Sequence, residues 1–205
     1  MVGYAYPAID ILQDEYTALV PLLPEHGHEL WNAAREGGPE LFHHLFFGPF
    51  EHRADLQAWI EERSGQHENP VFAIRSERLS AVVGSVQLKP VDTINGSTEI
   101  SSIWVSPRTQ GSEVVPGFVR HVLRYLFEEL GYRRVVWKCD ATNIPSRHAA
   151  EGIGFTLEGV FRKHMFIRGR SRDTAWYAVV DSDWERVRTI LNSRIDERAH
   201  RSEIR

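Results

Sequence analysis

The chain has 205 residues, of which 42% are hydrophobic and 25% charged, and this composition predicts a globular protein with a sizeable core. The formal net charge of −4 argues against a general nucleic-acid binder, which normally carries a basic excess. The sequence shows neither an apolar run near the roughly 20 residues of a membrane span nor a secretory signal in residues 1–10, so we expect a cytoplasmic protein without membrane contact.

The first part of the chain reads as one strand followed by two helices. The expected elements are a strand, a helix, an aromatic-rich segment of ambiguous type and a second helix, at 15–22, 25–35, 36–50 and 51–65. In the second helix Leu56, Trp59 and Ile60 recur at the spacing of one helical face, and Gly65 suits the position after its end.

The rest of the chain alternates between strands and helices. We expect an antiparallel hairpin, a third strand, an amphipathic helix, a buried strand, a short Ala-rich helix and two final strands, with the long elements at 71–75, 79–91, 98–105, 114–130, 133–140, 156–167 and 173–180. The tail from Asp183 reads as a helix that frays after Ile195. We therefore divide the chain into a single domain, residues 1–184, and a charged helical extension, residues 185–205.

This order of elements predicts an α+β fold with one strand–helix–strand crossover between Ile100 and Cys139. Such a crossover normally places its two strands side by side and parallel. Small-molecule sites favour the carboxyl ends of parallel strands. Polar residues follow both strands, in "SPRTQGSE" and in "DATNIPS", so the expected site lies there.

The stretch "DATNIPSRHAAEGIGF" at 140–155 permits two readings. Asn143 and Ser146 stand three apart around Pro145, directly before an apolar helix. Asn or Ser before a helix, with Pro in its first turn, is a plain capping pattern. The alternative is that the two side chains hold a ligand, and the residues by themselves favour the cap.

Taken together, "EISSIWVSPRTQG", the helix after it, "WKCDATNIPSRHAAEGIGF" and "EGVFRKHMFIRGRSRDTAWYAV" resemble the GNAT superfamily of acyl-coenzyme-A-dependent N-acyltransferases. The chain looks most like the branch of the RimJ/RimL-type ribosomal-protein N-acetyltransferases, from about Glu15 to Trp184. The resemblance implies the GNAT fold, a mixed central sheet with two splayed parallel strands flanked by helices. It also implies acetyl-CoA as cosubstrate and no metal, and it reverses the preference at Asn143 and Ser146 from cap to ligand.

In this family the pantetheine arm lies in the gap between the splayed strands, and the pyrophosphate lies on the loop and helix start after the first of them. Free N–H groups and the positive end of the helix dipole favour an anion there. Carried over to this sequence, the coenzyme-binding residues are Ile103, Trp104, Val105, Gln110, Gly111, Ser112, Val114, Val115, Asn143 and Ser146.

The pyrophosphate loop departs from the family pattern at three positions. Glu113 stands where a glycine is usual and adds negative charge, Val115 adds bulk, and Pro116 removes a possible N–H donor. Arg108 or Arg120 are candidates to compensate. Pro in the first helical turn also has a plain reading as helix-start chemistry.

Acetyl transfer to an amine requires a base and, in many relatives, an acid. Glu99 begins the strand that would hold the coenzyme and is our candidate for the general base; a solvated Glu at a strand end is the alternative. The position at which many relatives carry an acidic tyrosine is Ala150 here. Ser146 is therefore the candidate that assists the leaving thiolate, and backbone N–H groups near Val105 are candidates to polarise the thioester carbonyl.

Other conspicuous residues receive plainer readings. The ten histidines lack the spacing of a helical zinc motif, and we expect no metal site. His164 is a second candidate proton acceptor. Arg168, Arg170 and Arg172 either bind an acidic group or form a solvated turn. Cys139, the single cysteine, cannot form an intrachain disulfide and reads as a core residue.

Two functions from different classes follow. The leading one is an N-acetyltransferase, EC class 2.3.1, which transfers an acetyl group directly to a primary amine on a small molecule or on a peptide or protein N-terminus. The other is a non-catalytic binding or regulatory module of the same fold, motivated by the altered pyrophosphate loop. A homodimer is left open, and no nucleic-acid partner is expected.

Overall fold

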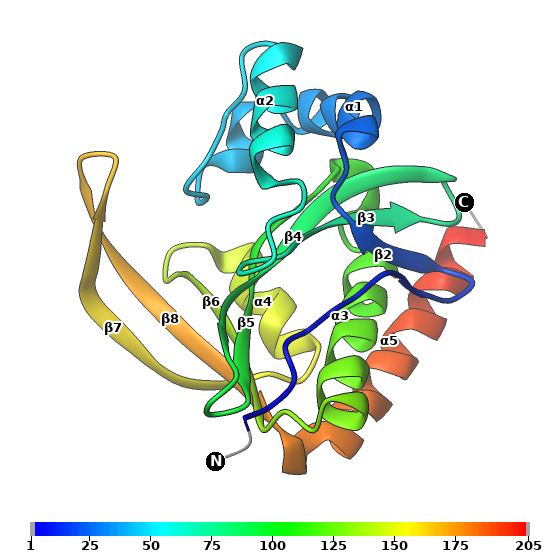
Figure 1. Cartoon of the computed structure of the whole chain (residues 1–205), viewed down its shortest axis with the longest axis vertical. Coiled ribbons are helices and arrows are strands. Elements are labelled where there is room, and N and C mark those ends of the chain that lie inside the picture. The colour runs from blue at the N-terminus through cyan, green and yellow to red at the C-terminus, as the bar shows by residue number, and fades with distance from the viewer. Residues whose placement is uncertain (1–2, 204–205) are drawn as a thin grey trace.

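The computed structural model describes residues 3–203, with the side chains of residues 3–201. Within these residues eight strands form one sheet in the order β1-β2-β3-β4-β5-β6-β8-β7 (Figure 1). The strands are β1 (Leu12–Gln13), β2 (Thr17–Pro21), β3 (Val71–Ser76), β4 (Ala81–Asp92), β5 (Ser97–Val105), β6 (Arg134–Asp140), β7 (Thr156–Ile167) and β8 (Arg170–Val180). The α-helices are α1 (Gly27–Gly37), α2 (Arg53–Arg63), α3 (Val114–Arg124), α4 (Ile144–Gly152) and α5 (Trp184–Glu203).

The two faces of the sheet bury separate cores because successive side chains of a strand point to opposite faces. On β3, Phe72 and Ile74 belong to the core that includes residues of α3, α4 and α5. Val71 and Ala73 belong to the second core, under α1 and α2. The expected helix at 114–130 is α3 continued by a π-helical turn at Tyr125–Glu129.

Helix α5 packs along α3 and contributes to the main core (Figure 1). Val187, Leu191 and Ile195 recur every fourth residue, and none of them is exposed to solvent. The helix continues to Glu203, where we expected fraying after Ile195. The expected boundary at residue 184 therefore separates residues that pack into one core.

The central feature for function is the divergence of β5 from β6. These strands are parallel, as the crossover predicts, but they pair only from Ser97 to Glu99. Beyond that point β6 keeps its pairing with β8, while β5 follows β4. The register of β5 against β4 shifts near Ser102, whose φ of 54° is left-handed. The mixed sheet with splayed parallel strands is thus confirmed.

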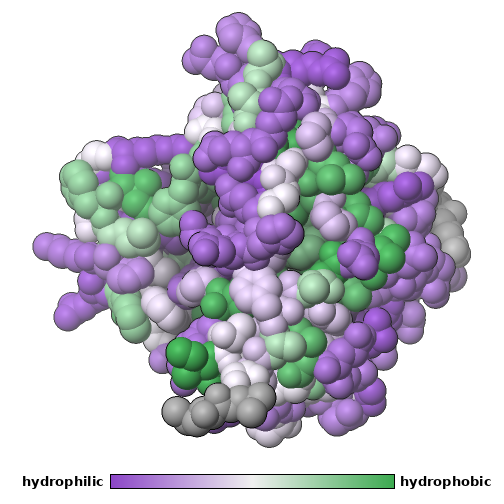
Figure 2. All heavy atoms as spheres, in the orientation of Figure 1, coloured by the Kyte–Doolittle hydropathy of each residue, from purple (hydrophilic) through white to green (hydrophobic). Residues whose placement is uncertain are grey.

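The β7–β8 hairpin projects from the body of the molecule (Figure 1). Its β8 arm begins at Arg170 rather than at the expected 173, so Arg172 lies within a strand and not in a polar turn. Apolar side chains, including Met165 and Phe166, are exposed near the hairpin tip, which appears as a green area in Figure 2. Among the described residues, none of the helices combines the length and apolarity that crossing a bilayer requires.

Candidate active site

A cavity of about 810 Å³ occupies the gap between β5 and β6. The starts of α3 and α4 lie on one side of it, and the segment between α1 and α2 lies on the other. The predicted site residues that line it are Glu99, Ile103, Trp104, Val105, Gln110, Val115, Asn143 and Ser146. Gly111, Ser112 and Val114 are not among its lining residues, and Val114 is fully buried in the core.

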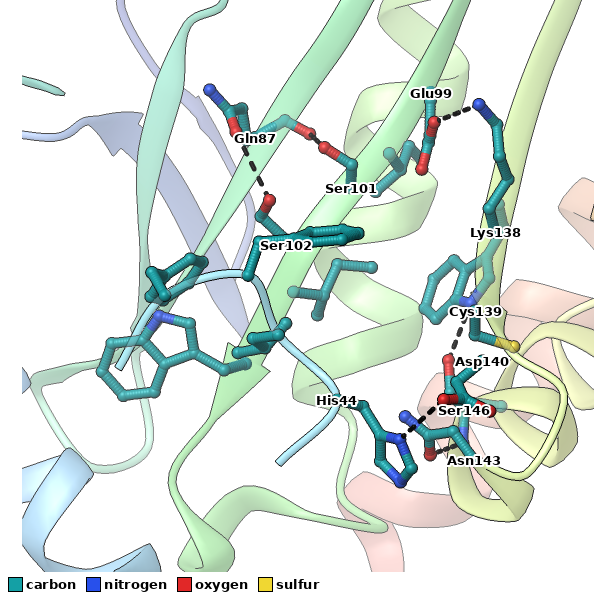
Figure 3. Close-up of a pocket in the computed structure, with 18 of the residues that line it drawn as sticks. His44, Gln87, Glu99, Ser101, Ser102, Lys138, Cys139, Asp140, Asn143 and Ser146 are labelled. Carbon is teal, nitrogen blue, oxygen red and sulfur yellow. Dashed lines mark hydrogen bonds and ion pairs between the residues drawn. The ribbon is translucent and has the colours of Figure 1, made fainter. Parts of the chain in front are cut away.

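Glu99 lies at the point where the strands part, and its carboxylate faces the cavity (Figure 3). Lys138 Nζ on β6 is 2.7 Å from Glu99 Oε2. Burial raises the pKa of Glu99, and Lys138 opposes that rise. The ammonium of Lys138 also lies 4.1 Å from the centre of the Trp176 ring. Glu99 is therefore a partly desolvated carboxylate held in place by Lys138, and the reading as a solvated strand-end residue is wrong.

The irregular part of β5 gives the cavity its backbone wall. The Ser102 hydroxyl donates to Gln87 Oε1 at 3.3 Å, which fixes the residue in its left-handed conformation (Figure 3). Trp104 is only 3% exposed and its ring packs against Phe42 in the second core. The irregularity near Ser102 interrupts the regular ladder between β4 and β5. Residues 102–105 thus bring main-chain groups to the same cavity as Glu99.

In the first turn of α3, two of the three residues offer no free N–H. Ser112 Oγ accepts from the N–H of Val114 at 3.2 Å, and Pro116 has no N–H. Within the described first turn, this leaves the N–H of Val115, a cavity-lining residue, for an anion. Arg198 of α5 donates to the carbonyl of Ser112 at 3.0 Å. Helix α5 therefore supports this loop directly.

Glu113 does not line the cavity, which corrects our expectation for the loop. Its side chain is 2% exposed, and Arg78 Nε lies 3.3 Å from its Oε1. The residue is the N-cap position of α3, and its carbonyl accepts from Gly117 at 2.8 Å. The negative charge is thus paired on the core side of the loop and does not face a pyrophosphate.

The two arginines considered as compensating charges also have other partners. Arg120 pairs with Asp14 and donates to Asn192 at 2.9 Å, so it ties α3 to the β1–β2 turn and to α5. Arg108 is 3.5 Å from Glu36 at the end of α1. Arg120 does not line the cavity, and neither does Arg108.

The stretch at the start of α4 serves as a cap and as a cavity wall at once. Asn143 Oδ1 accepts from the N–H of Ser146 at 3.1 Å, which is a helix cap. Ser146 Oγ accepts from Trp137 Nε1 at 3.0 Å, so its own hydroxyl proton is left to donate elsewhere (Figure 3). Cys139 is buried beside Ser146, and burial raises the pKa of its thiol. The amide nitrogen of Asn143 is not used by the cap.

The β6 and β8 side of the cavity, beside the start of α4, contains Lys138 and Asp140, which the sequence reading missed, and Arg172, which it named as a candidate to bind an acidic group. Asp140 Oδ2 lies 3.6 Å from His44 Nδ1 and 3.7 Å from Arg170. Burial disfavours the charge of Asp140, but hydrogen bonds from Thr142 outweigh it and lower the pKa. Arg172 also lines this wall and is only 7% exposed. A lysine inside an otherwise apolar strand was the available sequence signal for Lys138.

Among the described residues, no group of three or more His, Cys, Asp and Glu side chains is arranged to hold a metal ion. His164 Nδ1 lies 3.0 Å from Thr174 Oγ1, and His164 is not among the cavity-lining residues. Ala150, where a tyrosine acid is common, is fully buried. The titratable groups that meet in the cavity are therefore Glu99, Lys138, Asp140, Arg172 and their neighbours.

Comparisons with known proteins cover most of the chain. Residues 19–156 match the family described as acetyltransferase (GNAT) domain. YdaF of Bacillus subtilis, provisionally named a ribosomal N-acetyltransferase, is 30% identical over 105 residues, which are 51% of this chain and 57% of YdaF. This match therefore spans little more than half of that relative's length.

Two solved structures extend the likeness to the whole fold. A GCN5-related N-acetyltransferase from Brucella melitensis has a TM-score of 0.90 and 35% identity, covering 94% of this chain and 88% of that one. The microcin C7 self-immunity acetyltransferase MccE, in complex with acetyl-CoA and AMP, has a TM-score of 0.73 and 22% identity, covering 82% of this chain and 93% of that one.

Proposed function

Because the chain belongs to the GNAT acetyltransferase domain family, we propose that it transfers an acetyl group from acetyl-CoA to a primary amine by direct attack. The observation that carries the proposal is the meeting of Glu99, the backbone of residues 102–105 and the starts of α3 and α4 around one cavity. A protein of the same fold was solved with acetyl-CoA, which supports the choice of donor.

The coenzyme side of the cavity is the side of β5, α3 and α4. The pantetheine arm would lie along residues 103–105, with its phosphates toward Gln110 and the N–H of Val115. Asn143 would offer its amide nitrogen to the arm while its oxygen caps α4. This assignment places the thioester near the point where β5 and β6 part.

The reaction needs a neutral amine, a polarised carbonyl and a proton for the thiolate. Glu99 accepts the proton of the acceptor ammonium, directly or through one water, and the amine nitrogen then attacks the thioester carbon. A main-chain N–H of residues 102–105, the stretch that includes Val105, stabilises the developing oxyanion. The carbon–sulfur bond then breaks and the amide forms, and the second proton lost by the amine nitrogen passes to the leaving thiolate, which the Ser146 hydroxyl stabilises by hydrogen bonding.

The acceptor class is a small amine or a peptide or protein N-terminus. Among similar chains, YdaF is named for ribosomal N-acetylation, whereas one from Vibrio cholerae is named spermidine N(1)-acetyltransferase. The main observation in favour of the non-catalytic alternative no longer holds, because Glu113 is paired with Arg78 away from the cavity. We propose a cytoplasmic location, since a single, free, buried cysteine suits a reducing compartment.

Binding and transfer are tested separately. A rise of the melting temperature with millimolar acetyl-CoA is expected, because a ligand that binds only the folded state stabilises it. Coenzyme thiol release with a panel of primary amines should depend on Glu99, and Glu99→Gln should lower kcat while leaving acetyl-CoA affinity nearly intact. Wild-type turnover of Glu99→Gln across pH would remove Glu99 from the mechanism.

A pair of variants at Asn143 separates its two roles. Asn143→Ser keeps a capping oxygen and loses the amide, whereas Asn143→Ala loses both. We expect Asn143→Ala to cost about 1 kcal/mol of stability and Asn143→Ser only a few tenths. Both should weaken acetyl-CoA binding by calorimetry. If Asn143→Ser binds acetyl-CoA as the wild type does, the residue is only a cap.

A further inference from the structure

Arg172 is a buried cation on the β8 side of the cavity, which we call the acceptor side because the proposed coenzyme side is formed by β5, α3 and α4. It lies on β8 opposite Met165 of β7, and its residue is 7% exposed. Its guanidinium carbon is 5.1 Å from the centre of the Phe46 ring, which comes from the segment between α1 and α2. Its surroundings are therefore the hairpin and the aromatic segment.

Arg172 differs from its neighbours in having no partner for its charge. Among the described residues it forms no hydrogen bond and no ion pair, and its Nε is completely buried without one. By contrast, Arg170 lies 3.7 Å from Asp140, and Arg168 donates to the carbonyl of Gly48 at 2.7 Å. A buried charge without a partner destabilises the folded protein. Such a charge is therefore unusual unless a ligand supplies the partner.

The two carboxylates that attract Arg172 already have other partners. Glu99 is paired with Lys138, and Asp140 lies between His44 and Arg170. Glu99 and Asp140 still attract Arg172 electrostatically from a distance, although burial is the dominant effect and lowers the pKa of the guanidinium. Among the described residues, the cavity lining thus contains a guanidinium that has no hydrogen-bonded or ion-paired partner and lies within electrostatic range of the candidate base.

We propose that Arg172 binds an oxyanion carried by the acceptor, so that the acceptor is an amine that also bears a carboxylate or phosphate group. The inference rests on the proposed function. The guanidinium holds the anion by hydrogen bonds and directs the amine toward Glu99. The Phe46 ring lies 5.1 Å from the guanidinium carbon and forms part of the same wall.

The test uses matched amines that differ only in the anion. β-Alanine is compared with β-alaninamide, and O-phosphoethanolamine with ethanolamine, so the two arms separate a carboxylate from a phosphate. For at least one pair we expect kcat/KM, measured by coenzyme thiol release, to be at least tenfold higher for the anionic amine. Equal rates within both pairs would overturn the inference while upholding the acetyltransferase.

Variants assign the preference to Arg172. Arg172→Met should reduce the ratio within the pair to about one through KM of the amine, with KM for acetyl-CoA unchanged. Arg172→Lys should keep part of it, and Arg170→Met is the matched control that should keep all of it. A raised KM for acetyl-CoA in Arg172→Met would instead mean that the residue binds a coenzyme phosphate, and a preference that survives in this variant would also refute the proposal.

Stability provides a readout that does not need activity. Without acceptor, Arg172→Met should melt at the same temperature as the wild type or higher, because it removes an unpaired buried charge. Sodium phosphate should raise the melting temperature of the wild type more than that of Arg172→Met. If none of the amines is acetylated, this difference decides, measured with sodium acetate as well as with sodium phosphate: equal responses of the two proteins to both anions, or a markedly lower melting temperature of the variant, would overturn the proposal.

Discussion

Glu113 provides the sharpest test of how the pyrophosphate loop is built. Replacing it by glutamine removes the charge that Arg78 Nε meets at 3.3 Å in a nearly solvent-free position. A hydrogen bond between charged groups contributes about 1.5–3 kcal/mol. Because the Arg78 side chain is 41% exposed and can turn to water, we expect the lower half of this range, about 2 kcal/mol.

The reciprocal change should cost more. Arg78→Met leaves the carboxylate of Glu113 in place, and that carboxylate is 2% exposed. Removing one partner of a buried pair costs about 3–5 kcal/mol, and because Arg78 itself is partly exposed we expect the lower end, about 3 kcal/mol. The double variant should be more stable than the sum of the single losses implies, because neither charge is then left alone.

Urea unfolding measures these changes, and calorimetry measures acetyl-CoA binding. With a typical slope for a protein of this size, a loss of 2 kcal/mol moves the midpoint by ~1 M. Exposed Glu51→Gln is the control and should move it little. Acetyl-CoA affinity should not rise in Glu113→Gln. A variant of full stability that binds acetyl-CoA more tightly would show that the carboxylate faces the coenzyme.

Three further outcomes follow from the site. Lys138→Met should move the acid limb of the kcat–pH profile to higher pH, because Lys138 opposes the rise of the Glu99 pKa and the carboxylate is the active form. An acid limb that stays in place would show that Lys138 does not tune the Glu99 pKa. Arg198→Ala should weaken acetyl-CoA binding by calorimetry, since its hydrogen bond holds the carbonyl of Ser112; unchanged affinity would refute this role. Gly84→Ala should cost about 1–3 kcal/mol in urea unfolding and weaken acetyl-CoA binding, because its Cβ would lie 2.1 Å from a carbonyl oxygen of β5; wild-type stability would contradict the packing.

The parts of the fold that are local in sequence were predictable. Hydrophobic spacing located the helix at 53–63, and the crossover rule placed β5 and β6 side by side and parallel. The length of α5 was missed because its charged C-terminal half looks like solvent-exposed chain. Its buried side chains at Val187, Leu191 and Ile195 become meaningful only once α3 lies beside them.

The location of the candidate site was predictable, but the positions and partners of its charged side chains were not. The resemblance brought Glu99, Asn143 and Ser146 to one place, and the structure puts them around one cavity. It could not tell that Glu113 points away, because the direction of a side chain at a helix start depends on a partner 35 residues earlier. The sequence pattern assigned Arg172 to a polar turn, because the local pattern does not encode where β8 begins.

A crystal structure grown with excess acetyl-CoA tests the central claim most directly. We predict the pantetheine arm between β5 and β6, its carbonyl near Ser102 and its phosphates at the start of α3, with Arg78 and Glu113 still paired. A coenzyme bound elsewhere, or a gap that stays empty of it, would contradict the account.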